Sequence, residues 1–107
     1  MRLRAAFGLA VPVALAALAA TAGAATGDRE LGEYLFGECT ACHQASGHQT
    51  GAIPAIIGLP EEHFVEAMQA YRSGERESTV MRALAARLTA EEIAALASYL
   101  GSLSRQP

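Results

Sequence analysis

The stretch Cys39-Thr40-Ala41-Cys42-His43 decides the fold of this chain. Two residues separate the cysteines and a histidine follows directly, which is the spacing of an attachment site for c-type haem. With this spacing both sulfurs can reach the two vinyl groups on one porphyrin edge as thioethers, while the histidine is carried under the ring. The sequence therefore predicts one covalent haem c, held by Cys39 and Cys42, with His43 as an iron ligand.

Other uses of a close cysteine pair fit the sequence less well. A thioredoxin-like dithiol needs a strand and a βαβ context, whereas the residues around this motif have helical periodicity. A structural zinc site needs four ligands, and outside the motif only His48 and His63 remain, at spacings that match no familiar zinc finger. We expect both of these histidines to be solvated. A disulfide across so short a loop would add little stability.

The first 24 residues have the organisation of a secretory signal peptide. Arg2 and Arg4 give a positive start, an apolar block rich in alanine covers 9–20, and the small residues 22–24 suit cleavage near Ala24/Ala25. We therefore expect a periplasmic protein whose monohaem domain spans 25–107. An uncleaved membrane anchor is the alternative, because the 23 uncharged residues from 5 to 27 could just span a bilayer.

Composition and charge exclude several classes of protein. The chain has 107 residues, of which 51% are hydrophobic and 18% charged, so a disordered or collagen-like chain is excluded. The part from residue 25 onward holds six arginines and eleven acidic residues, a formal net charge of −5. Because nucleic-acid binding requires an excess of cations, this charge argues against it. A buried porphyrin would supply apolar core to a domain this small.

The periodicity of the chain predicts an all-α domain, because no segment alternates as a strand would. A first helix is expected over 28–38, and Gly32 within it suggests that another helix crosses closely there, since mid-helix glycine costs about 1 kcal/mol relative to alanine. The partner should be the last helix, which opens with a capping box of Thr89 and Glu92 and has Gly101 available as a stop. The crossing should be packed by Phe36 with Tyr99 or Leu96.

Two further helices are expected between the crossing helices. The central one should begin with Pro60 at its first position and end before Gly74. A shorter one should follow Ser78 or Thr79. The expected buried stripe of the central helix is Phe64, Ala67, Met68 and Tyr71; that of the shorter one is Met81, Leu84, Ala85 and Leu88.

The loop between His43 and Pro60 is rich in glycine and small polar residues. Pro54 and its apolar neighbours look like the wall of a ligand crevice, although an ordinary turn is the alternative. A ligating imidazole usually donates its other N–H to a nearby acceptor, and a backbone carbonyl around Pro54 is our candidate for His43.

Met81 is our choice for the sixth iron ligand. Haem in electron carriers is often held by histidine and methionine, and beyond the predicted signal only Met68 and Met81 remain. Met68 lies in the middle of an apolar stripe, where methionine usually fills core space. Met81 begins its helix just after a polar loop and can be brought over the ring opposite His43. Met68, or a free or otherwise occupied position, remains the alternative.

Arg72 and Arg76 flank the loop before Met81 and are candidates to pair with the haem propionates. The more ordinary interpretation makes both of them solvated members of a mixed-charge turn with Glu75 and Glu77.

These features together resemble the class I c-type cytochromes over essentially the whole chain from residue 25. The resemblance implies a small fold in which the N- and C-terminal helices cross and haem occupies a crevice between helices and loops. The residues that carry it are Leu35-Phe36, Cys39, Cys42, His43, Pro54, Met81, Leu88 to Ile93 and Leu96 to Leu100.

A narrower resemblance is to the cytochrome subunit of flavocytochrome c sulfide dehydrogenase and to single halves of related dihaem cytochromes. It rests on residues 64–68, 71–75 and 78–81. In that family a flavoprotein subunit oxidises sulfide and the cytochrome takes electrons from its FAD. The resemblance therefore implies Met81 as axial ligand and an FAD-containing partner. This chain departs from the two-haem members because it has no second Cys-x-x-Cys-His.

The function expected from the residues and the resemblance is one-electron transfer, with no catalytic residue in this chain. One alternative is a free monohaem shuttle that feeds a terminal oxidase or another respiratory partner, with docking that weakens in salt. A haem enzyme or gas sensor with an open iron site is another, and it requires that Met81 does not ligate.

Overall fold

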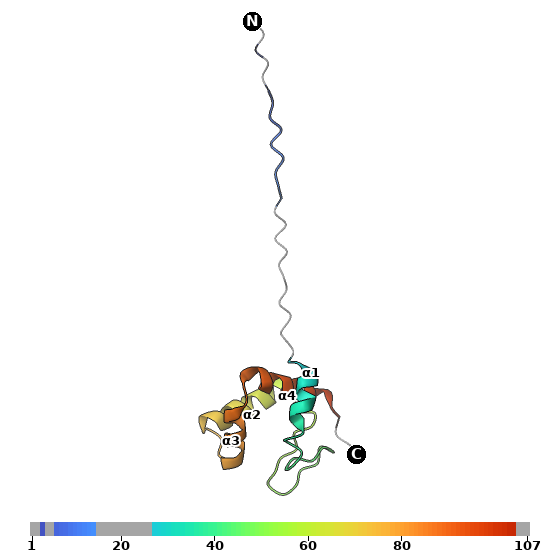
Figure 1. Cartoon of the computed structure of the whole chain (residues 1–107), viewed down its shortest axis with the longest axis vertical. Helices are drawn as coiled ribbons and strands as arrows, with labels where there is room; N and C mark the ends of the chain where they lie inside the picture. Colours follow the sequence, from blue (N-terminus) through green and yellow to red (C-terminus); the bar gives the residue numbers. More distant parts are fainter. Residues whose placement is uncertain (1–2, 4–5, 15–26, 105–107) are drawn as a thin grey trace.

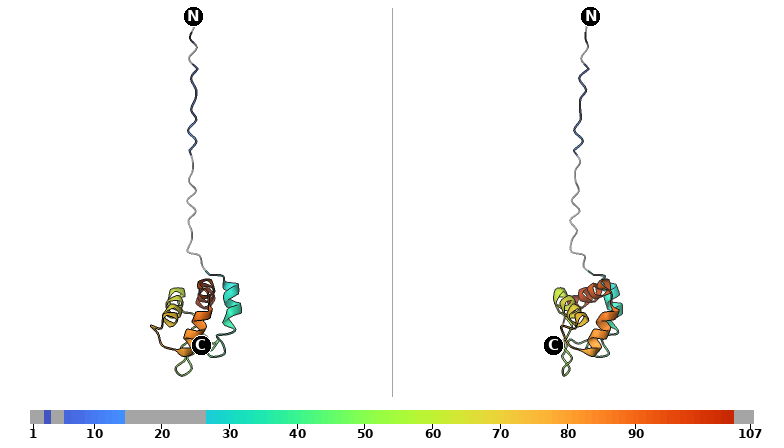
Figure 2. Two further views of the ribbon diagram at one scale, coloured as in Figure 1. Left: turned by 60° about the vertical axis from the view of Figure 1, so that its left-hand side comes forward. Right: turned by 90° about the vertical axis from the view of Figure 1, so that its left-hand side faces the viewer.

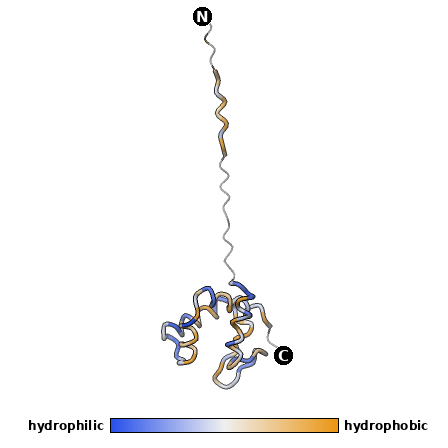
Figure 3. The backbone as a smooth tube through the Cα atoms, in the orientation of Figure 1, coloured by the Kyte–Doolittle hydropathy of each residue, from blue (hydrophilic) through white to orange (hydrophobic). Residues whose placement is uncertain are grey.

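The structure is a computed structural model that describes residue 3, residues 6–14 and residues 27–104 (Figure 1). Most of the predicted signal peptide, including the cleavage site near Ala24/Ala25, lies outside the described residues. The described segment before residue 15 is largely hydrophobic (Figure 3), and its apolar side chains are exposed, with Phe7 at 94% and Leu9 at 93%. Within the described ranges, no helix has the length and apolar character needed to cross a membrane.

Four helices make up the described domain: α1 (Arg29–Phe36), α2 (Glu61–Ser73), α3 (Thr79–Arg87) and α4 (Ala90–Ser102). No strand occurs among residues 27–104, where the one β-type contact is an isolated bridge between Thr50 and Ile53. The predicted all-α class is therefore confirmed. α1 packs on α4, and α2 contacts both α3 and α4.

α1 begins one residue later and ends two residues earlier than the expected helix. The Asp28 side chain accepts hydrogen bonds from the N–H groups of Glu30 (3.0 Å) and Leu31 (3.2 Å), which caps the helix. At its C-terminal end the expected helix over 28–38 extends two residues too far, because the Cys39 N–H donates to Phe36 O (2.9 Å) across three residues. That tighter turn ends the regular i to i+4 pattern before the haem motif.

The predicted crossing of α1 and α4 at Gly32 is confirmed (Figure 2). A Cβ atom on Gly32 would lie 2.1 Å from Ala95 O and 2.8 Å from Tyr99 Cβ, so only glycine allows this approach. One turn further along, the rings of Phe36 and Tyr99 pack with centroids 5.5 Å apart and planes inclined by 57°. The contact between α1 and α4 is therefore formed entirely by backbone and side-chain atoms of this chain.

α4 has the predicted start but not the predicted stop. Thr89 and Glu92 form a capping box, with the Glu92 N–H donating to Thr89 Oγ1 at 3.1 Å and the Thr89 N–H donating to Glu92 Oε1 at 2.9 Å. Gly101 does not end the helix, which continues through it. A Cβ atom there would lie 3.2 Å from Glu61 Cγ and 3.3 Å from Leu59 O, so this glycine permits close approach of the segment before α2.

α2 and α3 follow the predicted pattern with one shift. Pro60 is the N-cap of α2 rather than its first residue, because its ψ of 138° is not helical. Gly74 ends α2 in the left-handed conformation, with φ at 79°. Ser78 caps α3 by accepting the N–H of Met81 at 3.2 Å. The cap fixes the first turn of α3, and Met81 is held in that turn.

The apolar core lies where the helices and the loop before α2 meet. In the expected stripe of α2, three members are buried and Ala67 is half-buried. The buried apolar side chains are Phe36, Ile56, Ile57, Phe64, Met68, Tyr71, Ala85, Ile93, Ala95, Leu96, Ala97 and Leu100.

Candidate cofactor site

A cavity of about 280 Å³ lies beside this core, and helices α1 to α4 and the loop after α1 all contribute to its wall. Its volume is close to the lower end of the range for small-molecule and cofactor sites, and apolar side chains form most of its wall. All four predicted site residues, Cys39, Cys42, His43 and Met81, line it. The other lining residues are Leu35, Glu38, Pro54, Ala55, Ile56, Leu59, His63, Phe64, Ala67, Met68, Tyr71, Arg76, Val80, Leu84, Leu88 and Leu96.

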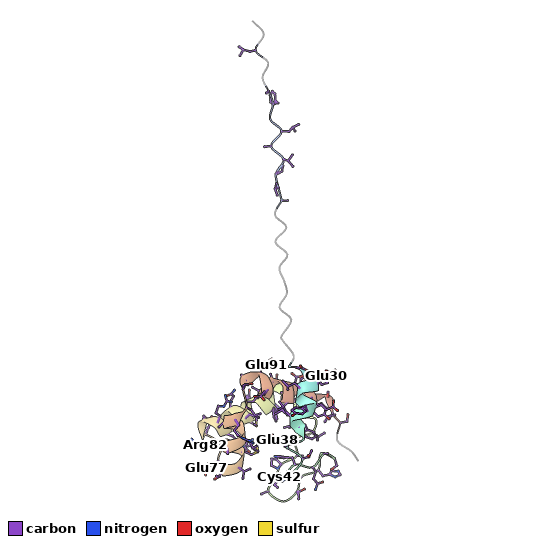
Figure 4. The ribbon with its side chains drawn as sticks, viewed as in Figure 1. Glu30, Glu38, Cys42, Glu77, Arg82 and Glu91 are labelled. Atoms are coloured by element: carbon purple, nitrogen blue, oxygen red, sulfur yellow. The ribbon has the colours of Figure 1, made fainter. Side chains whose placement is uncertain are left out.

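The cysteine motif continues from α1 as a series of turns. The N–H groups of Cys42 and His43 both donate to Cys39 O, at 3.2 Å and 2.8 Å. This coiling turns both sulfur-bearing residues toward the same cavity. Neither cysteine forms a disulfide; Cys39 is half-buried and Cys42 is exposed. Figure 4 labels Glu38 and Cys42 near the end of α1.

The Cys39 thiol is partly buried and lies close to a negative charge. Burial, and secondarily the negative charge of Glu38, raise the pKa of the Cys39 thiol from 9.0 to about 11. The group is therefore a neutral thiol at physiological pH. Conversion to a thioether removes that titratable proton and leaves an apolar sulfur, which suits the surroundings of this side chain.

His43 is buried and its ring orientation is fixed. It is 8% exposed, and its Nδ1 lies 2.7 Å from Pro54 O. Because a carbonyl only accepts, Nδ1 must carry the hydrogen, and the lone pair is on Nε2. The predicted hydrogen bond to a backbone carbonyl at Pro54 is confirmed. The imidazole is therefore oriented, and Nε2 is left for another partner. It shares an apolar cavity with two thiols. These features fit the requirements of covalent haem.

Both candidate methionines line the cavity. Met68 is only 4% exposed and belongs to the core cluster on α2. Met81 is half-buried, packs against that cluster, and lies in the first turn of α3. The structure brings both sulfur-bearing residues to the site from different helices, α2 and α3.

The two arginines have different surroundings. Arg76 lines the cavity, and its guanidinium carbon lies 4.8 Å from the centroid of the Tyr71 ring, an arrangement for a cation–π contact. Arg72 is not among the lining residues. Its Nε and Nη2 donate to Ala85 O at 3.3 Å and 3.0 Å, and Nη2 also donates to Leu88 O. The solvated-turn interpretation of Arg72 is therefore wrong, and its pairing with a haem propionate stays a prediction.

The remaining histidines are exposed, as predicted. His48 lies in the loop after the motif, with its Nδ1 3.4 Å from Ser46 Oγ. His63 nevertheless lines the cavity, which was not predicted. The signal for it was present, because His63 extends the stripe of Ala67 and Tyr71 by one helical turn toward the start of α2.

Comparison with known proteins agrees with the geometry of this site. The family model described as cytochrome c matches residues 30–104. The cytochrome subunit of sulfide dehydrogenase from Chlorobaculum tepidum is 39% identical over 75 residues, which are 70% of this chain and 68% of that protein.

Two further relatives are longer proteins. The thiosulfate dehydrogenase electron acceptor of Thiomonas intermedia is 34% identical over 67 residues, covering 61% of this chain and 31% of the relative. Cytochrome c4 of Azotobacter vinelandii is 31% identical over 71 residues, covering 61% of this chain and 34% of the relative. This chain thus matches about a third of the length of each of these two proteins.

Proposed function

Because this chain belongs to the cytochrome c family and carries covalently bound haem c, we propose that it is a periplasmic one-electron carrier with Cys39 and Cys42 as the thioether positions and His43 and Met81 as the axial ligands. When bound, the haem supplies an iron that accepts and releases one electron. The observation that carries the proposal is the hydrogen bond from His43 Nδ1 to Pro54 O, which leaves Nε2 as the coordinating nitrogen.

The chain's own residues supply orientation and exclusion of water. The Pro54 carbonyl fixes the tautomer of His43 and increases the basicity of Nε2, the nitrogen that would bind the iron. The apolar wall, with Phe64 and Leu96 among its buried members, keeps the site at low polarity. A rigid, dry site limits reorganisation between the two oxidation states, as electron transfer requires.

Met81 is the better of the two thioether candidates. Met68 is a buried member of the core cluster on α2, where methionine usually fills space. Met81 is held in the first turn of α3 by the Ser78 cap and is less tightly enclosed. A thioether ligand from either methionine would favour reduced iron and raise the reduction potential, which suits a carrier that accepts electrons.

The ligand assignment is tested by the weak far-red sulfur-to-iron absorption band of the oxidised protein. We expect Met81→Ala to abolish the band, and the volume-conserving control Met68→Leu to retain it. Loss of the band only in the Met68 variant would reject Met81 as the ligand. Stoichiometric binding of carbon monoxide to the reduced wild-type protein at neutral pH would instead favour an open iron site.

The electron donor that we propose is an FAD-containing flavoprotein that oxidises sulfide. The 39% identity to a cytochrome subunit of sulfide dehydrogenase, over 68% of that protein, supports this assignment. Purification of the native protein from the periplasm of its host should retain a flavin-containing partner at high salt. A monomer whose docking disappears with salt would instead indicate a free shuttle, as its acidic charge would allow.

Export is the remaining part of the proposal. The basic start, apolar block and small residues of the first 24 positions support a cleaved signal. Mass analysis of the protein isolated from its host should give a chain that begins near Ala25. A full-length chain retained in the membrane fraction would show that the segment is an anchor.

A further inference from the structure

Arg72 joins the end of α2 to the end of α3. It lies in the last turn of α2, and its guanidinium bonds the carbonyl oxygens of Ala85 and Leu88, which are 13 and 16 residues further along the chain. Ala85 lies in the last turn of α3 and Leu88 is the C-cap of that helix. The side chain is half-buried, so these contacts are partly shielded from water.

The chemistry of this contact is specific to arginine. The last carbonyls of a helix have no partners within it, and they carry partial negative charge. A planar guanidinium with several fixed N–H donors can hold two such oxygens at once, whereas a lysine ammonium acts as a compact point charge. Arg72 therefore adds donors at the end of α3, where Ala85 O also accepts the Leu88 N–H at 3.4 Å, and fixes the position of this helix against α2.

The two ends of α3 are thus held in different ways. Ser78 caps its start through the N–H of Met81, and Arg72 holds its end through Ala85 and Leu88. The residues of this short helix that face the cavity include Met81 and Leu84. We therefore expect a change at the far end of the helix to reach the residues that form the cavity wall.

We propose that Arg72 is a positioning residue that holds α3, and with it the Met81 sulfur, in place over the haem. This inference rests on the proposed ligation by Met81. Arg72 does not reach the cavity itself. Without Arg72, α3 should swing away from the cavity more often, and an added ligand should displace Met81 more easily.

The test measures the affinity of the oxidised holoprotein for imidazole. Binding is monitored by the loss of the far-red band. Arg72→Met removes the charge and the donors but keeps most of the side-chain length, and Arg72→Lys keeps the charge without the fork. Arg82→Met is the matched control, because Arg82 is an exposed arginine on α3 (Figure 4). Its guanidinium lies near Gly74 and makes no hydrogen bond or ion pair with the residues that the structure describes. The free energy of unfolding of each variant is measured in parallel.

We expect Arg72→Met to raise imidazole affinity about tenfold, as loss of a charge-assisted hydrogen bond implies. Arg72→Lys should give a smaller increase, and Arg82→Met should match the wild type. If Arg72→Met does not fold, the lysine variant carries the test. Unchanged imidazole affinity in a variant of lower stability would assign Arg72 a merely structural role and overturn the proposal. An equal increase in the Arg82 control would do the same.

Failure of the ligand assignment gives a different result. If Met81→Ala keeps the far-red band, Met81 is not the ligand, and the inference fails with it. If the band requires Met81 but imidazole removes it with the same affinity in the Arg72 variants and the wild type, the ligand assignment stands and only the positioning role is rejected.

Discussion

α1 and α4 meet so closely that a Cβ atom on Gly32 would lie 2.1 Å from Ala95 O, whereas α2 and α3 supply most of the helical lining of a cavity of about 280 Å³. We call the first region the crossing and the second the haem side. The crossing is complete without any cofactor, because backbone and ring contacts close it. The haem side lines its cavity mainly with apolar side chains. The comparison indicates that α1 and α4 set the frame and that haem completes the other half.

The largest effect should follow from preventing haem attachment with the double change Cys39→Ala and Cys42→Ala. Apolar lining such as Leu84 and Leu88 would lose its partner, so the haem side should open while the crossing persists longer. Amide hydrogen exchange in α3 and in residues 43–58 should accelerate about a hundredfold more than exchange in α1 and α4. Equal acceleration throughout the domain would remove the distinction between the two regions.

A smaller but still severe effect is expected from Gly32→Val, which acts on the crossing. The added side chain would overlap the backbone of Ala95, and the free energy of unfolding of the holoprotein should fall by about 3 kcal/mol or more. The control is Gly37→Ala, because Gly37 has φ of −54° and its Cβ would meet its nearest atom, Tyr34 O, at 3.6 Å. That change should be neutral or stabilising by about 0.4–1 kcal/mol. A tolerated valine at Gly32 would show that the crossing is not tightly packed.

The smallest effect concerns the ion pair between Glu38 and Arg87, which links the end of α1 to α3. Arg87 Nη2 lies 3.6 Å from Glu38 Oε2, and both side chains are about two-thirds exposed. Such pairs contribute little in water, so Glu38→Gln should change the free energy of unfolding by less than about 0.5 kcal/mol. A loss above about 1 kcal/mol in denaturant unfolding would show that the two regions are joined more strongly than their burial indicates.

The crossing could be predicted largely because its signals are local. A capping box identifies the start of α4 from Thr89 and Glu92 alone, and a glycine within a helical pattern implies close approach at Gly32. Local pattern also has limits. Gly101 has the appearance of a helix stop, yet its neighbours in space, Glu61 and Leu59, give it a packing role instead.

The haem side could be predicted only in part. The haem motif and the hydrogen-bond acceptor at Pro54 could be predicted, because both follow from chemical rules. These rules are the spacing of the cysteines and the need of a ligating histidine for a hydrogen-bond partner. The contacts of Arg72 were not, because they join residues 13 and 16 positions apart whose proximity depends on how α2 and α3 pack. The position of His63 on the cavity wall could have been predicted from its helical register.

The most direct test of the account is mass analysis of the protein purified from its own host, after denaturation and acid–acetone extraction. We predict one haem per chain, retained on the peptide that contains Cys39 and Cys42, with neither thiol available to an alkylating reagent. Pigment that is fully extracted, or free thiols at both positions, would contradict covalent attachment at this motif and the electron-carrier function that depends on it.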